Sequence, residues 1–393
     1  MKYLFLLLLI IGYLLINQIY TPEVYHYQFH PELIEKYLRS QDIPYEVDNR
    51  IFLSDSDIYI GSGYLYATGA DPTDYDFQHP PLIKYGFGLF IHLTGNPFHL
   101  QIILSIIYIV ITYLLGIKLT HNLYIPFFAA CLIILDPLFR DQTHQALLDL
   151  GQAVFLLSFT YIQIFFPNKK ILSGLFLGLA AASKYWPPCL FFFVFFTVYH
   201  HRHVWKQCLN NLLDLPTKPN LNLKISLNIQ QLISMINPPL VTTAIFVFTA
   251  TYLPSFILQT GKFNFIWFQL RTFKYWLDHS AASFPGSNLW LFITGFYYNW
   301  WDKNWTFDQL WNPLWPLSLL IINCLFLYQI KKNPSPHPQM PNIIGVILIN
   351  SYLFFLSFQA PFSRYFIIIL PLLYLQALHT IHFLFHTFNP LKK

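Results

Sequence analysis

Long apolar runs recur along the whole sequence and limit what the chain can fold into. Ten runs approach the roughly 20 residues that a helix needs to cross a bilayer, at 3–20, 98–117, 122–138, 146–166, 169–183, 187–200, 238–257, 313–330, 341–359 and 364–386. Only 10% of the 393 residues are charged, against about 25% in a typical soluble domain. We therefore predict an all-α polytopic membrane protein with about 10 to 11 transmembrane helices, folded as one domain over residues 1–393.

Two further features refine this topology. The first run follows Lys2 as a signal peptide would, but it is long and no A-x-A-like site follows it, so we expect an uncleaved helix. The run Tyr85–Gly95 is too short to cross, and we place it along the membrane interface.

The charged residues separate by side of the membrane. With an inner N-terminus, lysines and arginines crowd into short inner loops and tails, as the positive-inside rule expects. Of the 18 acidic residues, only Asp214 falls on the inner side. We infer that the outer face carries the function.

Two long outer segments, 21–97 and 258–312, contrast with the short connections elsewhere. Both are rich in Trp, Tyr and Phe, which argues against disorder, and we expect interfacial helices in them. The inner segment 201–237 is predicted to be a solvated basic connector. No basic stripe with interleaved aromatics suggests nucleic acid, and the four cysteines have no C-x-x-C spacing that would indicate zinc.

The first outer segment gathers carboxylates beside a membrane surface. Asp55 and Asp57 would share a face on an extended segment, but not on a helix. A partly desolvated carboxylate there is a candidate general base for a hydroxyl acceptor, and a solvated surface pair is the alternative. We choose Asp55 first and Asp57 as its substitute. Asp71 and Asp74 are expected to shape turns around Pro72.

Several cations are expected near the outer interface: Lys84, Arg140, Lys184, Arg271 and Arg364. Each could bind a lipid phosphate or only snorkel to headgroups. We favour Arg140, in the outer turn DPLFRDQTHQALLD, and Arg364, at the start of the last helix.

The stretch DYDFQHPPLIKYGF joins the acidic segment to the membrane. Pro80 and Pro81 restrict the backbone and would hold His79 level with a lipid phosphate, although an ordinary proline break is the alternative. His79 could bind sugar or phosphate, or hydrogen-bond the loop. Asp149 is costly to bury alone, so we expect it to pair with Lys184 or Arg140.

Motifs in the first 300 residues resemble the protein O-mannosyltransferase (dolichyl-phosphate-mannose–protein mannosyltransferase) family. In order along the chain they are D-S-D-I-Y, then H-P-P-L-I-K, A-L-L-D-L at 146–150, G-L-F-L-G-L-A-A-A-S-K-Y-W at 174–186 and F-Q-L-R-T-F-K-Y-W-L-D-H-S-A-A-S-F-P-G-S at 268–287. The sequence departs from the family pattern at Ser56, Phe77 and His144, where the family has Glu, Asp and Arg.

The resemblance implies a membrane glycosyltransferase of the C type that takes a sugar, mannose in that family, from a polyprenyl phosphate. It implies an acceptor on the outer or lumenal face, which is a protein in that family. Because a lipid phosphate is already a good leaving group, a single inverting displacement from such a donor needs only one carboxylate, as the base. In a prokaryote the membrane would be the plasma (inner) membrane. The predicted catalytic residues are Asp55 and Asp57, and the predicted substrate-binding residues are Asp76, His79, Lys84, Arg140, Asp149, Lys184, His279 and Arg364.

Alternative functions remain open at this point. The same fold could glycosylate a lipid or a cell-wall polymer, or the chain could be a transporter or flippase of lipid-linked sugars. Transporters tend to carry charges at the bilayer centre and internal repeats, whereas these charges gather at one face. We predict no metal ligands: Asp55 and Asp57 could hold a divalent ion, but two carboxylates leave its shell incomplete.

Overall fold

A computed structural model describes residues 1–40, 51–202, 237–279, 284–299, 303–332 and 343–388. Ten helices carry the apolar sequence: α1 (Lys2–Tyr20), α6 (Phe98–Thr120), α7 (Tyr124–Leu135), α9 (Asp149–Phe165), α10 (Lys170–Ser183), α11 (Pro187–His200), α14 (Pro238–Ala250), α18 (Leu314–Lys332), α19 (Ile343–Leu356) and α20 (Leu370–Phe388).

Shorter elements connect these helices. They are α2 (Pro22–His26), α3 (Glu32–Ser40), α4 (Asp55–Ala67), α5 (Leu82–Thr94), α8 (Pro137–His144), α15 (Leu253–Leu258), α16 (Phe265–His279), α17 (Ser287–Thr294) and the 3₁₀ helix η2 (Ser363–Ile368). Strands β1 (Phe296–Asn299) and β2 (Asn304–Phe307) form an antiparallel pair in which Phe296 faces Phe307.

Each predicted crossing coincides with one of the ten apolar helices, and the all-α polytopic membrane architecture is confirmed. Within the described ranges, α1 and α6 are long and apolar enough to cross a membrane by themselves, and α8 with α9, bent by 118°, would make a third span. The remaining apolar helices have 10 to 17 residues in their apolar parts. The predicted crossing 238–257 is shorter than expected, since α14 ends at Ala250 and α15 follows.

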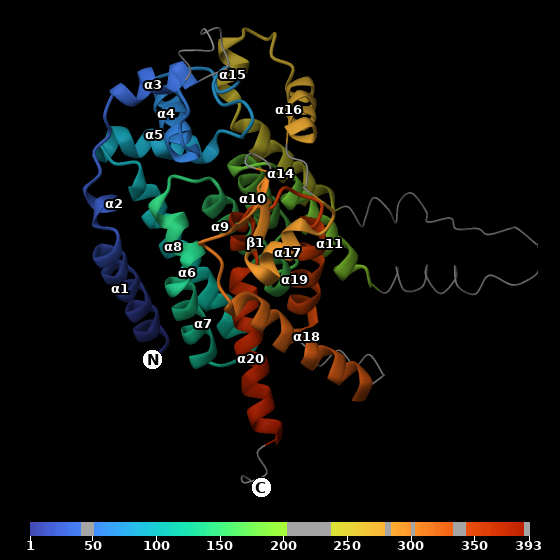
Figure 1. Cartoon of the computed structure of the whole chain (residues 1–393). Coiled ribbons are helices and arrows are strands. Elements are labelled where there is room, and N and C mark those ends of the chain that lie inside the picture. The colour runs from blue at the N-terminus through green and yellow to red at the C-terminus, as the bar shows by residue number, and fades with distance from the viewer. Residues whose placement is uncertain (41–50, 203–236, 280–283, 300–302, 333–342, 389–393) are drawn as a thin grey trace, which may run out of the picture.

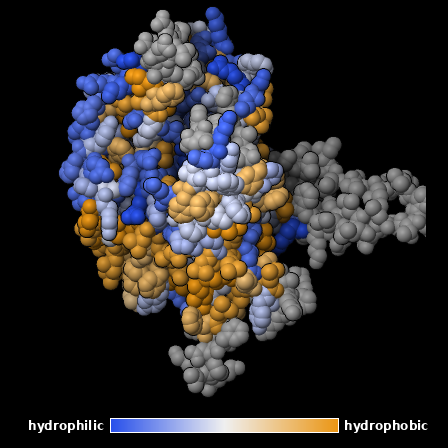
Figure 2. Space-filling model, viewed as in Figure 1, coloured by the Kyte–Doolittle hydropathy of each residue, from blue (hydrophilic) through white to orange (hydrophobic). Residues whose placement is uncertain are grey.

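The molecule has an apolar end and a polar end. In Figure 1, α1, α6, α7 and α20 lie toward the end that holds both chain termini, and α3, α4, α5, α15 and α16 lie at the opposite end. Figure 2 shows hydrophobic residues over the lower part of this face and hydrophilic residues over the upper part. The elements of 21–97 therefore lie on the polar side with α15 and α16, while the inner connector 201–237 lies almost wholly outside the described residues.

Two helices of the first long segment cross with almost no space between their backbones. A Cβ atom built on Gly88 of α5 would lie 2.1 Å from the carbonyl oxygen of Gly63 in α4, and one on Gly63 would lie 2.4 Å from the oxygen of Lys84. Only glycine allows this approach. The contact fixes the start of α4, which carries Asp55, relative to the loop before α5.

A buried carboxylate that the sequence analysis did not single out anchors α8. Asp136 caps the helix by accepting a 2.9 Å hydrogen bond from the amide of Leu138. Its other oxygen accepts hydrogen bonds from Trp315 Nε1 at 2.9 Å and Tyr374 Oη at 2.6 Å. The segment predicted to be an outer turn is thus a helix, and Asp136 ties it to α18 and α20.

Candidate functional site

The start of α4 separates the two candidate bases. Ser54 caps the helix: its hydroxyl accepts the amide of Asp57 at 3.2 Å and donates to Asp57 Oδ2 at 2.8 Å. Asp55 is the first helical residue and lies on another face. The helical alternative is therefore the one observed, and the two carboxylates are held by different partners. Within the described ranges, no three His, Cys, Asp or Glu side chains gather as a metal site.

Asp55 pairs with Arg364 across the molecule. Nη1 of Arg364, on η2, donates to Asp55 Oδ2 at 2.5 Å. The Asp55 side chain is 46% exposed and that of Arg364 21% exposed, so a ligand can reach both. Burial raises the pKa of Asp55, but the charge and the hydrogen bond of Arg364, together with the nearby charge of Lys184, outweigh it and hold that pKa below its ordinary value. Asp55 is thus a carboxylate at neutral pH.

A second ion pair joins Asp149 and Lys184. Asp149 is the first residue of α9, and Lys184 is the C-cap residue directly after α10. The lysine Nζ donates to Asp149 Oδ1. Both side chains are buried, and Asp149 Oδ2 has no hydrogen-bond partner in the described part of the chain. Of the two partners expected for Asp149, the structure selects Lys184.

The two ion pairs form one charge cluster, which we define as Asp55, Asp149, Lys184 and Arg364. Lys184 Nζ lies 4.9 Å from the ring centroid of Tyr365, the residue after Arg364. Burial lowers the pKa of Lys184 to about 8, although Asp149 and Asp55 favour its charged form. Four separate elements (α4, α9, the end of α10, and η2) bring these side chains together.

Lys84 is fully buried and organises the loop before α5. Its Nζ donates to Asp76 Oδ2 at 3.0 Å and to the carbonyl oxygens of Asp76 and His79, both at 2.8 Å, and lies 3.2 Å from the hydroxyl of Tyr66. These acceptors engage all three ammonium protons. Asp76 adopts a left-handed backbone with φ 42°, which the lysine holds in place. Lys84 and Asp76 therefore stabilise the loop, and they do not bind a ligand through these atoms.

The His79 side chain extends from this loop and packs against the rings of Tyr59 and Trp276. Its ring lies 5.4 Å from that of Tyr59 and 4.9 Å from that of Trp276 on α16, centroid to centroid. Trp276 Nε1 donates to the carbonyl oxygen of Gln78 at 2.8 Å, which joins the two long segments. His79 Nδ1 is buried 3.7 Å from Asp76 Oδ1 without a hydrogen bond within the described residues. Burial lowers the pKa of His79, and Asp76 only partly offsets this, so the ring is neutral at pH 7.

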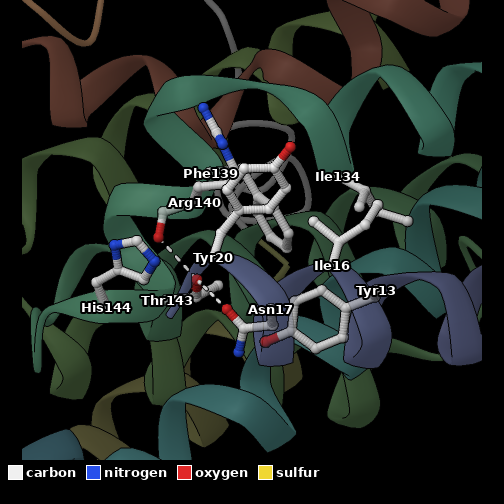
Figure 3. Close-up of a pocket in the computed structure, with 9 residues that line it drawn as sticks. All are labelled: Tyr13, Ile16, Asn17, Tyr20, Ile134, Phe139, Arg140, Thr143 and His144. Carbon is white, nitrogen blue, oxygen red and sulfur yellow. Dashed lines mark hydrogen bonds between the residues drawn. The ribbon is translucent and has the colours of Figure 1, made fainter. Parts of the chain in front are cut away.

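The structure does not bring every predicted residue to the cluster. Arg140, on α8, lies in a pocket against α1 (Figure 3), and its guanidinium carbon is 5.5 Å from the Tyr20 ring centroid. Within the described residues, no ion pair joins Arg140 to the charge cluster. His279 is the last residue of α16, and its side chain lies outside the described part.

Two residues beside the site were missed by sequence reasoning. The hydroxyl of Ser56 accepts the amide of Ala146 at 2.9 Å and so fixes the start of α4 against the approach to α9. Tyr59 is buried one helical turn after Asp55. The four-residue spacing from Asp55 would have indicated Tyr59 once α4 was known to be a helix. For Ser56 we find no sequence signal.

The chain is a polytopic membrane protein with the C-type (GT-C) glycosyltransferase fold. The structure is similar to that of ArnT from Cupriavidus metallidurans, solved bound to undecaprenyl phosphate, with a TM-score of 0.57 and 12% sequence identity. The match covers 89% of this chain and 59% of ArnT, so the chain spans little more than half the length of that neighbour. No protein-family profile and no curated protein sequence matches the chain.

Proposed function

We propose that this protein transfers a hexose from a polyprenyl-phosphate sugar to an acceptor hydroxyl by a single inverting displacement. The observation that carries the proposal is the charge cluster on a GT-C fold: one exposed carboxylate held beside two cations. The undecaprenyl phosphate bound by the structural neighbour supports a lipid-linked donor.

Asp55 is the proposed general base. Arg364 engages its Oδ2, and within the described residues Oδ1 has no hydrogen-bond partner, so Oδ1 can accept the proton of an acceptor hydroxyl. The acceptor oxygen forms a bond to the anomeric carbon as the bond from that carbon to the phosphate oxygen breaks. The bonding electron pair leaves with the phosphate, and the hydroxyl proton passes to Asp55. No acid is needed, since the phosphate is already a good leaving group.

Arg364 and Lys184 are the proposed phosphate ligands. Nη1 of Arg364 is engaged by Asp55, whereas its Nε is buried without a partner among the described residues. A guanidinium can use two edges at once, so Arg364 can orient the base with one edge and bind the phosphate with the other. Negative charge grows on the phosphate in the transition state, where fixed cations stabilise it most.

Asp149, Lys84 and Asp76 are proposed to position the site. Asp149 keeps the Lys184 ammonium charged in a buried place, and the Lys84–Asp76 pair holds the loop that carries His79. We place the sugar against Trp276 and His79, because aromatic faces stack on hexoses.

The finer assignments rest on the resemblance to the protein O-mannosyltransferases. On that basis we propose mannose as the sugar and a protein as the acceptor, with His279 also near the substrate. The polar end that holds α3, α4 and α16 would face the outer or lumenal side (Figure 1). In a prokaryote this is the outer side of the plasma membrane. The segments 21–97 and 258–312 would then be the outer loops that build the site.

A reconstituted assay tests this function. Purified protein in liposomes is incubated with polyprenyl phosphates that carry radiolabelled mannose, glucose or aminoarabinose, together with peptide, glycan and lipid acceptors. We expect one donor to be consumed, Asp55→Asn to abolish its consumption, and Asp57→Asn to retain most of it. Wild-type protein that moves donor across the bilayer without cleaving it would instead identify a flippase.

A further inference from the structure

A hollow lies at the start of α10, beside the first residues of α14. Its volume is about 490 Å³, within the roughly 300–1,000 Å³ that ligand pockets usually have. It is lined by Asn168, Lys169, Lys170, Ile171, Leu172, Leu175 and Pro239. None of these residues takes part in the proposed transfer reaction.

The two helices that frame the hollow are packed tightly together. A Cβ atom built on Gly174 of α10 would lie 2.4 Å from the carbonyl oxygen of Leu240 in α14. One turn further along, a Cβ on Gly178 would lie 2.6 Å from the oxygen of Ala244. Only glycine allows the backbones to come so close. The hollow is therefore a fixed feature of the surface, and a ligand does not have to open it.

One wall of the hollow is apolar and uncovered. Ile171, Leu172 and Leu175 on α10 are 69%, 38% and 36% exposed. Because α10 is one of the apolar helices of a polytopic membrane protein, these side chains contact lipid tails, which are as apolar as leucine. A ligand that lies against this wall therefore carries hydrocarbon.

Two adjacent cations, Lys169 and Lys170, also line the hollow. Within the described ranges no carboxylate forms an ion pair with either of them. Lys169 is the N-cap residue of α10, and its side chain makes no capping hydrogen bond, so the amides of the first turn add to the attraction for an anion. An anionic group on a hydrocarbon body fits both the charges and the apolar wall.

The hollow lies one helix length away from the charge cluster. α9 begins with Asp149, and α10 packs against α9 and returns from Lys170 to Lys184. A helix of 17 residues, such as α9, is about 25 Å long. The hollow is therefore near the membrane face opposite to the Asp149–Lys184 pair, which is the inner face in the predicted topology. A ligand bound there is separate from the sugar donor.

We propose that this hollow binds an anionic glycerophospholipid of the inner leaflet, with its phosphate on Lys169 and Lys170 and an acyl chain along Ile171 and Leu175. Basic pockets between membrane helices on the cytoplasmic side suit such headgroups. The lipid fastens α9 and α10 at the end opposite to the charge cluster. The proposal is independent of the transfer reaction, because lipid binding needs neither sugar nor acceptor.

Native mass spectrometry of the full chain in detergent tests the site. The probes are phosphatidylglycerol, undecaprenyl phosphate and, as an uncharged control, diacylglycerol. We expect wild type to prefer phosphatidylglycerol, and Lys169→Gln and Lys170→Gln each to weaken its binding about fivefold, the effect of one lysine beside an anionic lipid. Diacylglycerol binding should not change. A preference for undecaprenyl phosphate that both variants abolish would overturn the choice of lipid.

The matched control is Lys118→Gln. Lys118 is exposed in the last turn of α6, on the predicted inner side but outside the hollow, and its replacement should leave phosphatidylglycerol binding unchanged. Leu175→Ser keeps both charges but removes part of the apolar wall, so it should weaken binding as well. If Lys118→Gln lost as much binding as Lys170→Gln, the lysines would only be snorkelling to headgroups. That result, or wild-type binding by Lys169→Gln, Lys170→Gln and Leu175→Ser, would overturn the proposal.

Discussion

Replacing Arg364 with glutamine should separate catalysis from stability. The Asp55–Arg364 pair joins side chains that are 46% and 21% exposed. Solvent screening therefore limits its contribution to folding, and we expect the free energy of unfolding to fall by no more than about 1 kcal/mol. Turnover should fall by about two orders of magnitude, because the variant loses the cation that faces both the base and the leaving phosphate.

The pH dependence supplies a second measurement on this variant. Arg364 helps to hold the pKa of Asp55 below its ordinary value, so without Arg364 that pKa rises. Activity needs the carboxylate form, and the acidic limb of kcat against pH should move to higher pH. The stabilisation from the pair is complete above the unfolded pKa of about 3.9 and disappears as pH falls through the lower folded pKa.

The conservative variant and the control sharpen the test. Arg364→Lys keeps the positive charge but lacks the planar guanidinium that can bind two groups at once. It should therefore restore the wild-type position of the acidic limb and the KM for the sugar donor, while kcat stays about tenfold below wild type. The control is Arg39→Gln. Arg39 lies in α3, in the segment 21–97 that also carries Asp55, and its replacement should leave kcat unchanged. Wild-type kcat in Arg364→Gln, or a loss of activity that only follows the loss of folded protein, would refute the reasoning.

Three further substitutions probe the framework of the site. Asp149→Asn leaves the buried Lys184 ammonium uncompensated and should cost about 3 to 5 kcal/mol, seen as a lower melting temperature; an unchanged melting temperature would exclude the buried pair. Lys84→Met removes the ammonium that donates hydrogen bonds to three buried oxygens. It should lower the yield of folded protein, measured by size exclusion, more than it changes the KM of the folded fraction for the sugar substrate. Gly88→Ala forces a Cβ against the Gly63 oxygen and should destabilise the protein by about 1 to 3 kcal/mol, whereas full stability would show that α4 and α5 are less tightly packed.

The sequence predicted the helices better than it predicted the site. Apolar runs located all ten apolar helices, and the separate runs 169–183 and 187–200 correspond to α10 and α11. Ser54 followed by Asp57 is a capping pattern that could have settled whether the acidic stretch was helical. Asp136 before Pro137 is likewise a helix start, which was missed inside an apolar run.

The long-range pairs could not be predicted from patterns. Asp55 and Arg364 are 309 residues apart, and nothing in the spacing of either indicates the other. Asp149 with Lys184 was predictable because a buried carboxylate needs a cation, and few lie at the right depth. The full set of hydrogen bonds that Lys84 donates depends on the left-handed backbone of Asp76, a conformation that sequence alone does not specify.

The most direct test of the central claim follows the anomeric carbon through one turnover. Enzyme in excess over a purified polyprenyl-phosphate hexose and its acceptor should release one polyprenyl phosphate per glycoside formed, and the glycoside should have the opposite anomeric configuration to the donor by NMR. Asp55→Asn should release none. Retention of configuration, or undiminished release by Asp55→Asn, would contradict a single displacement with Asp55 as its base.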